Sequence, residues 1–336
     1  ISPVHCAKAA VMNDQPRPDR RRRIAADLLK VAISLGLMAL LLRTIHWREI
    51  SSVLAHIHFG WFAVALLLFQ LGVIVRAYRW QILLRAGGVP TPLSVLIRWY
   101  FIGSLFNTVL PTGFGGDVVK TVALGRYAAR PGVVLGSVLL DRFSGIAMLM
   151  LTGVVVLLVA PGAVSPAVGW LLWLLFGGCA LAVLLMAQPA WAVALQRRFP
   201  ALARVKAGQW LLDAIPTYGL RPLLASFGVS LLFNTLLIVL NICFGLAVGI
   251  AVPWTYYLLF VPLISISLVL PSFGGLGVRE FSYVALFTQV GVTAATATAM
   301  GLLFYAVMMG AALIGGILYL APAAWWKPAF RSAEES

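Results

Sequence analysis

Two short stretches of the sequence combine glycines, a proline and charged side chains inside otherwise apolar segments. Residues 110–121 read "LPTGFGGDVVKT" and residues 270–280 read "LPSFGGLGVRE". An ionisable side chain at membrane depth is costly to keep, so such residues are functional candidates by default. Cationic side chains there can bind phosphate. Carboxylates can balance those cations, gate a pocket, or bind a cationic headgroup or a coupling proton.

The candidate binding residues are the charged and amide side chains in or near these stretches. They are Arg98, Asn107, Asp117, Lys120, Asp141, Arg142, Arg279 and Glu280. Asp117 and Lys120 are three residues apart, so on a helix they share a face and can pair. We expect Lys120, Arg142 and Arg279 to bind a phosphate group, with backbone N–H groups at helix N-termini assisting. The alternative is that acids and bases only neutralise one another, and that Arg98 is an interfacial anchor.

The glycines and prolines of both stretches predict turns. The expected turn residues are Pro111, Gly113, Gly115, Gly116, Pro271, Gly274, Gly275 and Gly277. Irregular backbone at membrane depth is tolerated only where protein buries it or water reaches it. We therefore expect two hairpin tips that meet near the midplane and line a cavity. Chance recurrence is the alternative, since the chain has 31 glycines, but the shared order of Leu-Pro, Phe-Gly-Gly and charge argues against it.

Other chemistry has weaker support in the sequence. "GFGGD" lacks the Gly-Lys-Ser/Thr ending of a nucleotide-binding P-loop and follows an apolar segment rather than a strand. The three cysteines have neither paired nor metal-ligand spacing. We expect no catalytic residues, no metal and no cofactor, although a spatially assembled site stays open.

The bulk composition sets the class of protein. The chain has 336 residues, of which 62% are hydrophobic and 10% charged, and this is too apolar for a soluble domain. Repeated apolar runs of spanning length predict a polytopic helical membrane protein. The net charge of +15 is typical of basic cytoplasmic loops rather than of nucleic-acid binding. Met12 is typical of a native start, so we expect residues 1–11 to carry no function.

The apolar runs and basic loops predict an all-α integral membrane bundle of six full spans plus two re-entrant helical hairpins. The spans are residues 24–42, 60–85, 133–160, 168–186, 223–250 and 296–320, and the hairpins are residues 93–130 and 254–292. The run Arg76, Arg79 and Arg85 with Tyr78 and Trp80 is typical of an inner-interface belt. Asn234 and Asn241 lie in apolar runs and favour interhelical hydrogen bonds.

The same apolar runs and basic loops predict the domain organisation. A basic tail (1–23) precedes a single transmembrane domain (24–322), and a short tail (323–336) follows it. Two repeats of opposite topology, about 24–160 and 167–320, make up the domain, and a cytoplasmic amphipathic linker occupies 188–221. Both termini are predicted to be cytoplasmic. Inverted halves with broken segments at matching places are typical of alternating-access transporters.

Three motifs together resemble those of the lysylphosphatidylglycerol synthase transmembrane regions, a flippase-like family. They are "NTVLPTGFGGDVVK", "LDRFSG" and "PSFGGLGVRE", and the resemblance covers about residues 24–320. The family pattern falls on Asn107, Pro111, Gly115, Gly116, Asp117, Asp141, Arg142, Gly274, Gly275, Gly277, Arg279 and Glu280. The chain departs from it at Lys120, where arginine is more frequent, and at Asp141, where glutamate is frequent. Both departures keep the charge.

The resemblance implies a function in lipid movement. In that family the transmembrane region is linked to moving a charged lipid across the bacterial inner membrane, and larger members add a soluble lysyltransferase domain. We expect the flippase-like half alone, a transporter rather than an enzyme. Its substrate is expected to be an anionic or aminoacylated phospholipid, or a polyprenyl-phosphate-linked lipid.

Two other functions stay open at this point. One is a membrane-embedded transferase acting on lipid-linked substrates, and the other is a non-catalytic membrane partner of a separate lipid-modifying enzyme that docks on residues 188–221. Expected partners are membrane lipids and no nucleic acid, with a homo-oligomer or that separate enzyme as protein partners.

Overall fold

The computed structural model describes residues 47–109, 115–128, 130–159, 166–187, 197–198, 220–267 and 277–320. Within these ranges the chain forms helices and no strands. Several predictions lie outside the described residues: both tails, the first span (24–42), most of the linker 188–221, and the turn residues Pro111, Gly113, Pro271, Gly274 and Gly275.

Four long apolar helices form the frame of the molecule. They are α4 (Phe59–Ala86), α7 (Pro131–Val159), α11 (Leu220–Ala247) and α14 (Ala294–Leu320). At 1.5 Å per residue each is about 40 Å long, which exceeds the ~30 Å hydrocarbon core of a bilayer. All four are long and apolar enough to cross a membrane. The all-helical class is thereby confirmed, and four of the predicted spans correspond to helices that are long and apolar enough to cross a membrane.

The helix α8 (Pro166–Ala187) occupies the position of another predicted span. Its most apolar part, residues 169–184, is shorter than those of the four long helices. Several large side chains on it are exposed, Trp170 and Leu174 among them. The total of six spans stays a prediction.

Shorter helices flank both glycine-rich stretches. α5 (Leu93–Val109) and α6 (Gly115–Tyr127) flank the first, and α12 (Trp254–Ser267) and α13 (Val278–Phe287) flank the second. A 3-10 turn, η3 (Thr288–Val290), follows α13. The segment between the predicted spans 24–42 and 60–85 contains a short helix, α3 (Trp47–Ala55). Both stretches thus separate helices, whereas their re-entrant character and the inverted repeat stay predictions.

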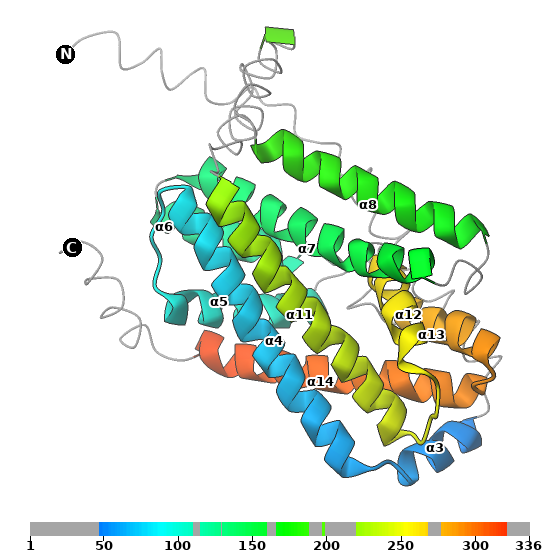
Figure 1. Ribbon diagram of the computed structural model, residues 1–336. Helices are drawn as coiled ribbons and strands as arrows, with labels where there is room; N and C mark the ends of the chain where they lie inside the picture. Colours follow the sequence, from blue (N-terminus) through cyan, green and yellow to red (C-terminus); the bar gives the residue numbers. More distant parts are fainter. Residues whose placement is uncertain are drawn as a thin grey trace, which may run out of the picture.

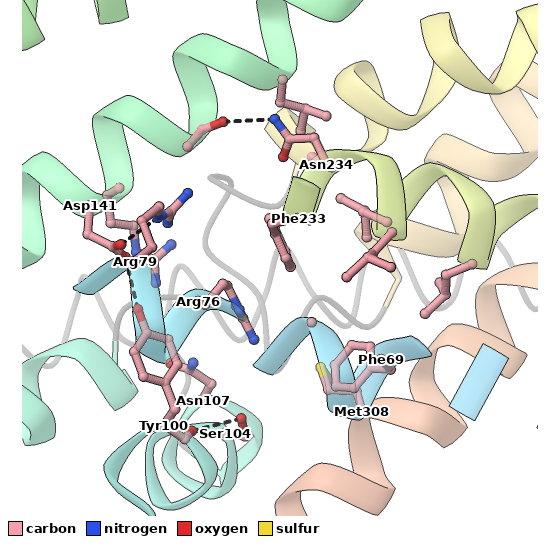
Figure 2. Close-up of a pocket in the computed structure, with 18 of the residues that line it drawn as sticks. Phe69, Arg76, Arg79, Tyr100, Ser104, Asn107, Asp141, Phe233, Asn234 and Met308 are labelled. Carbon is pink, nitrogen blue, oxygen red and sulfur yellow. Dashed lines mark hydrogen bonds and ion pairs between the residues drawn. The ribbon is translucent and has the colours of Figure 1, made fainter. Parts of the chain in front are cut away.

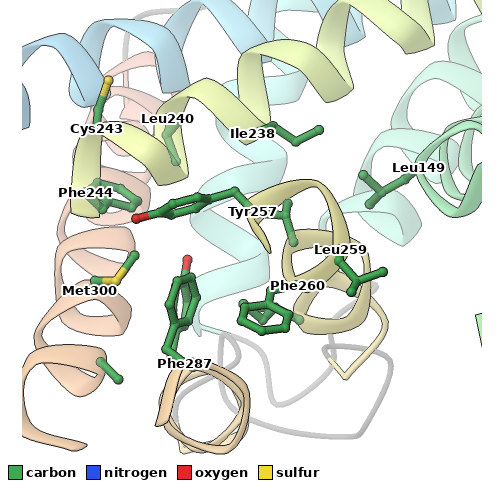
Figure 3. Packing of buried hydrophobic residues seen from close by; sticks show 14 of the residues in the cluster. Leu149, Ile238, Leu240, Cys243, Phe244, Tyr257, Leu259, Phe260, Phe287 and Met300 are labelled. Atoms are coloured by element: carbon green, nitrogen blue, oxygen red, sulfur yellow. The ribbon is translucent and has the colours of Figure 1, made fainter. Parts of the chain in front are cut away.

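The helices pack in neighbouring pairs. α4 runs beside α11, α5 packs along α14, and α7 packs along α8 (Figure 1). The larger apolar cluster gathers mainly side chains of α7, α11, α12, α13 and α14, among them Tyr257, Phe260, Phe287 and Met300 (Figure 3). A second cluster joins α4 to α5, α6 and α7 around Trp80 and Tyr100.

Glycine determines how closely α5 and α6 approach. A Cβ atom on Gly116 would overlap the backbone carbonyl oxygen of Gly103, which cannot swing aside as a flexible side chain can. Both positions are buried. Small residues at helix contacts let backbones approach in this way, so the Gly116 of the first stretch serves helix packing.

Candidate functional site

The described residues line a partly open cavity of about 330 Å³ between the two core clusters. One face of α4 contributes Leu68, Phe69, Gly72, Arg76 and Arg79, at the three- and four-residue spacing that places side chains on one side of a helix. Residues of α5, α6, α7, α11, α12, α13 and α14 complete the lining (Figure 2). Six of the eight predicted binding residues line it: Asn107, Asp117, Lys120, Asp141, Arg142 and Arg279.

Asp117 holds two cations at the start of α6. Its carboxylate lies 2.7 Å from the Lys120 ammonium, one turn further along the helix, and also accepts hydrogen bonds from the Arg142 guanidinium on α7. The Lys120 side chain is 6% exposed, that of Asp117 13% and that of Arg142 35%. The predicted pairing of Asp117 with Lys120 is confirmed, and Arg142 extends it into a link between α6 and α7.

Asp141 forms a second cluster that joins four helices. Its Oδ1 accepts a hydrogen bond from Arg79 Nε at 2.6 Å, and its Oδ2 accepts one from the Tyr100 hydroxyl at 2.9 Å (Figure 2). Arg79 also donates to Ser230 Oγ on α11 at 2.9 Å. Both oxygens of Asp141 therefore have donors, and α4, α5, α7 and α11 are tied together.

The interpretation of the α4 arginines as an interface belt is wrong for part of that run. Arg79 is 4% exposed and Trp80 is fully buried, and the Trp80 indole donates to Ser137 Oγ. Arg85 and Tyr78 are exposed, as a belt requires. Arginine and aromatic residues near the end of an apolar helix favour the interpretation as an interface belt. The helical spacing that places Arg76 and Arg79 on one face is the signal that distinguishes them from Arg85.

Aromatic rings lie against the cations of this region. The Lys120 ammonium is 3.7 Å from the centre of the Tyr100 ring, and the Arg76 guanidinium lies 5.5 Å from the same ring and 5.2 Å from that of Phe233. A cation over a ring face is attracted by the ring quadrupole, more strongly where water is excluded. Tyr100 thus contacts two cations through its ring and a carboxylate through its hydroxyl.

The second stretch places its two charged residues differently. Glu280, in the first turn of α13, accepts a hydrogen bond from the Gly277 N–H at 2.7 Å and so caps its own helix. Glu280 is not among the cavity-lining residues. Arg279 does line the cavity and lies 4.3 Å from the Phe304 ring. Its Nε and Nη1 have no hydrogen-bond partner within the part of the chain that the structure describes.

The predicted amide side chains take structural roles. Asn107 Oδ1 accepts the N–H of Gly116 at 2.7 Å and so holds the start of α6 against α5. Asn234 reaches the Gly145 carbonyl of α7, and Asn241 accepts a hydrogen bond from the Tyr283 hydroxyl. The interhelical bonds expected of Asn234 and Asn241 are confirmed.

Arg98 lies apart from the cavity. It is not among the lining residues, and its Nη2 donates to the Leu318 carbonyl of α14 at 2.7 Å. A role of Arg98 in binding stays a prediction that these contacts do not support.

The electrostatic balance of the cavity is positive. Five lining side chains are cationic and two are carboxylates: Arg76, Arg79, Lys120, Arg142 and Arg279 against Asp117 and Asp141. The other walls are largely apolar, with Phe69, Phe233 and Phe304 among them. Within the described ranges no three His, Cys, Asp or Glu side chains gather as a metal site would require. The arrangement suits an anionic group attached to an apolar body.

A family model for the lysylphosphatidylglycerol synthase TM region matches residues 28–316 of the chain. That range includes both glycine-rich stretches and every residue that lines the cavity. No curated protein and no solved structure matches the chain.

Proposed function

Because the chain belongs to the family of the lysylphosphatidylglycerol synthase transmembrane region, we propose that it moves a lipid with a charged headgroup across the bacterial inner membrane. The observation that carries this proposal is the cavity, in which cations outnumber carboxylates among apolar walls. Ionisable residues inside a membrane mark substrate pathways when they surround a polar cavity. The substrate class is an anionic or aminoacylated phospholipid, or a polyprenyl-phosphate-linked lipid.

The cavity offers complementary surfaces to such a lipid. Arginine donates hydrogen bonds in a planar fork that matches phosphate geometry, and lysine adds a point charge. The carboxylates Asp117 and Asp141 keep the cations in place and offer a counter-charge for an amino group on the headgroup. The acyl chains would remain in the surrounding lipid while the headgroup crosses.

We further propose that the two halves work as an inverted pair with both termini in the cytoplasm. The support is that each glycine-rich stretch lies between two short helices, α5 and α6 in one half and α12 and α13 in the other. Alternate opening of the cavity to the two sides then carries the headgroup across.

Transport is tested in liposomes that contain the full chain and fluorescent phosphatidylglycerol, aminoacylated phosphatidylglycerol or polyprenyl phosphate. We expect the fluorophore to exchange between leaflets faster than in protein-free liposomes, with the lipid chemically unchanged by mass spectrometry. Arg85→Gln is the matched control variant, since Arg85 is exposed and lies outside the cavity. A modified lipid product would favour the transferase alternative, and no acceleration with any of these lipids would contradict transport.

Topology is tested with single cysteines in a chain whose native cysteines are replaced. Thr108→Cys lies just before the first stretch and Ser267→Cys just before the second, and both positions are partly exposed. A membrane-impermeant maleimide should label the first from the cytoplasmic side and the second from the outside. Labelling of Thr108→Cys from the outside alone would rule out the inverted arrangement.

A further inference from the structure

Of the five cations that line the cavity, Arg76 and Arg279 have no ion pair within the described residues. Arg279 is only 4% exposed, whereas Arg76 is partly exposed where it lines the cavity. Lys120 and Arg142 share the carboxylate of Asp117, and Arg79 pairs with Asp141. Arg76 makes no ion pair within the described residues, and its Nε is buried without a hydrogen-bond partner there. The guanidinium therefore keeps its donors and its charge available.

Two aromatic rings lie close to the Arg76 guanidinium where this side chain lines the cavity. Its guanidinium lies between Tyr100 of α5 and Phe233 of α11, and the side chain is partly exposed where it lines the cavity (Figure 2). Aromatic rings attract a cation through their faces, whereas a guanidinium donates its hydrogen bonds in its own plane. The two rings can thus hold the cation while its N–H groups stay available to bind an anion.

Energetic reasoning points to a ligand for this side chain. A guanidinium removed from water without a counter-charge is costly, and membrane interiors keep such groups where they serve a function. The neighbouring carboxylates do not form an ion pair with Arg76, since Asp117 and Asp141 are each bound to other donors. An oxyanion in the cavity would supply the missing acceptor.

We propose that Arg76 is the principal phosphate-binding residue of the cavity, and that Lys120 and Arg142 mainly hold α6 against α7 through Asp117. The proposal rests on the proposed function for the identity of the ligand as a lipid headgroup. The chemistry it requires is the oxygen atoms of a phosphate ester, which a phospholipid headgroup carries and which inorganic phosphate shares.

The test measures binding of dioctanoyl phosphatidylglycerol to the purified full chain by native mass spectrometry. Dioctanoylglycerol, which lacks the phosphate, is the ligand control. Arg76→Gln should weaken phosphatidylglycerol binding by about 10- to 100-fold, the range for losing hydrogen bonds to a charged group. Arg76→Lys should weaken it less, because charge remains while the planar fork is lost. Arg142→Gln should have a smaller effect than Arg76→Gln, and Arg85→Gln should have none.

Inorganic phosphate distinguishes the two sources of the ligand group. If inorganic phosphate displaces the lipid from the wild type but not from Arg76→Gln, the result would support recognition of phosphate as such. Failure to compete, with lipid binding still lost in Arg76→Gln, would support recognition of a phospholipid headgroup. Equal binding of phosphatidylglycerol by the wild type and Arg76→Gln would overturn the proposal.

A merely structural role of Arg76 gives a different result. The melting temperature of ligand-free Arg76→Gln should equal or exceed that of the wild type, because no carboxylate loses a partner. A lower melting temperature with unchanged binding would assign Arg76 to packing and overturn the proposal. Arg76-dependent binding without transport would contradict the proposed function alone, whereas transport that is unaffected by Arg76→Gln would contradict this inference alone.

Discussion

The two glycine-rich stretches have similar residues but use their charges differently. In the first, Asp117 is the third residue of α6 and binds Lys120 on the same helix and Arg142 on α7. In the second, Glu280 is the third residue of α13 and accepts the N–H of Gly277 just before its own helix. The Asp117 carboxylate links two helices, whereas the Glu280 carboxylate caps the start of its own helix.

Spacing explains the difference. Lys120 follows Asp117 by three residues, which places both on one helix face. Arg279 precedes Glu280 by one residue, and adjacent residues on a helix do not face each other. Arg279 therefore points into the cavity against Phe304 while Glu280 turns back to the helix start. Matching motifs need not carry matching contacts when the order of acid and base changes.

The largest expected effect is on Asp117. Asp117→Asn leaves Lys120 and Arg142 without their carboxylate, and we expect the free energy of unfolding to fall by about 3 kcal/mol, as when one partner of a buried ion pair is removed. The matched variant Glu280→Gln keeps an oxygen for the Gly277 N–H and should cost less than about 1 kcal/mol. Chemical unfolding in detergent measures both. Equal losses of unfolding free energy in the two variants would show that the two carboxylates contribute equally to stability.

The glycines of the two stretches should also have different roles. In the first stretch, the role of the glycine is helix packing. Gly116→Ala places a methyl group against the Gly103 carbonyl, so α5 and α6 must separate, at about 2 kcal/mol. Gly103→Ala is the control, since its methyl group meets its nearest atoms only at 3.4 Å. Thermal unfolding should rank Gly116→Ala well below Gly103→Ala, and the reverse order would refute a packing role for Gly116.

In the second stretch the glycine is needed for its backbone conformation. Gly277 has φ of 80°, in the region that disfavours residues with a Cβ. Gly277→Ala should cost about 1 kcal/mol. Gly228→Ala, inside α11 with open space around it, should instead be neutral or stabilising, because alanine favours a helix. A destabilisation of the same size in both variants would contradict the conformational explanation.

Much of the fold could be predicted because membrane helices follow from apolar runs alone. The positions of α4, α7, α11 and α14 required only length and hydropathy. The pairing of Asp117 with Lys120 followed from helical spacing. Contacts between distant elements did not follow, since Arg79 with Asp141 spans 62 residues of the chain. Nothing local in the sequence near Arg76 specifies that Tyr100 and Phe233 lie beside it.

The smallest expected effect on stability belongs to Arg279. It has no carboxylate partner in the described ranges, so Arg279→Gln removes a buried charge without leaving another one unpaired. We expect its unfolding free energy to equal or exceed that of the wild type, while lipid exchange in liposomes falls because the cavity loses a cation. Arg142→Gln is the matched comparison, since it takes one of two cations from Asp117 and should lower stability. If Arg279→Gln destabilises the chain as much as Arg142→Gln does, then Arg279 holds the fold together, and the two stretches are alike in what their cations do.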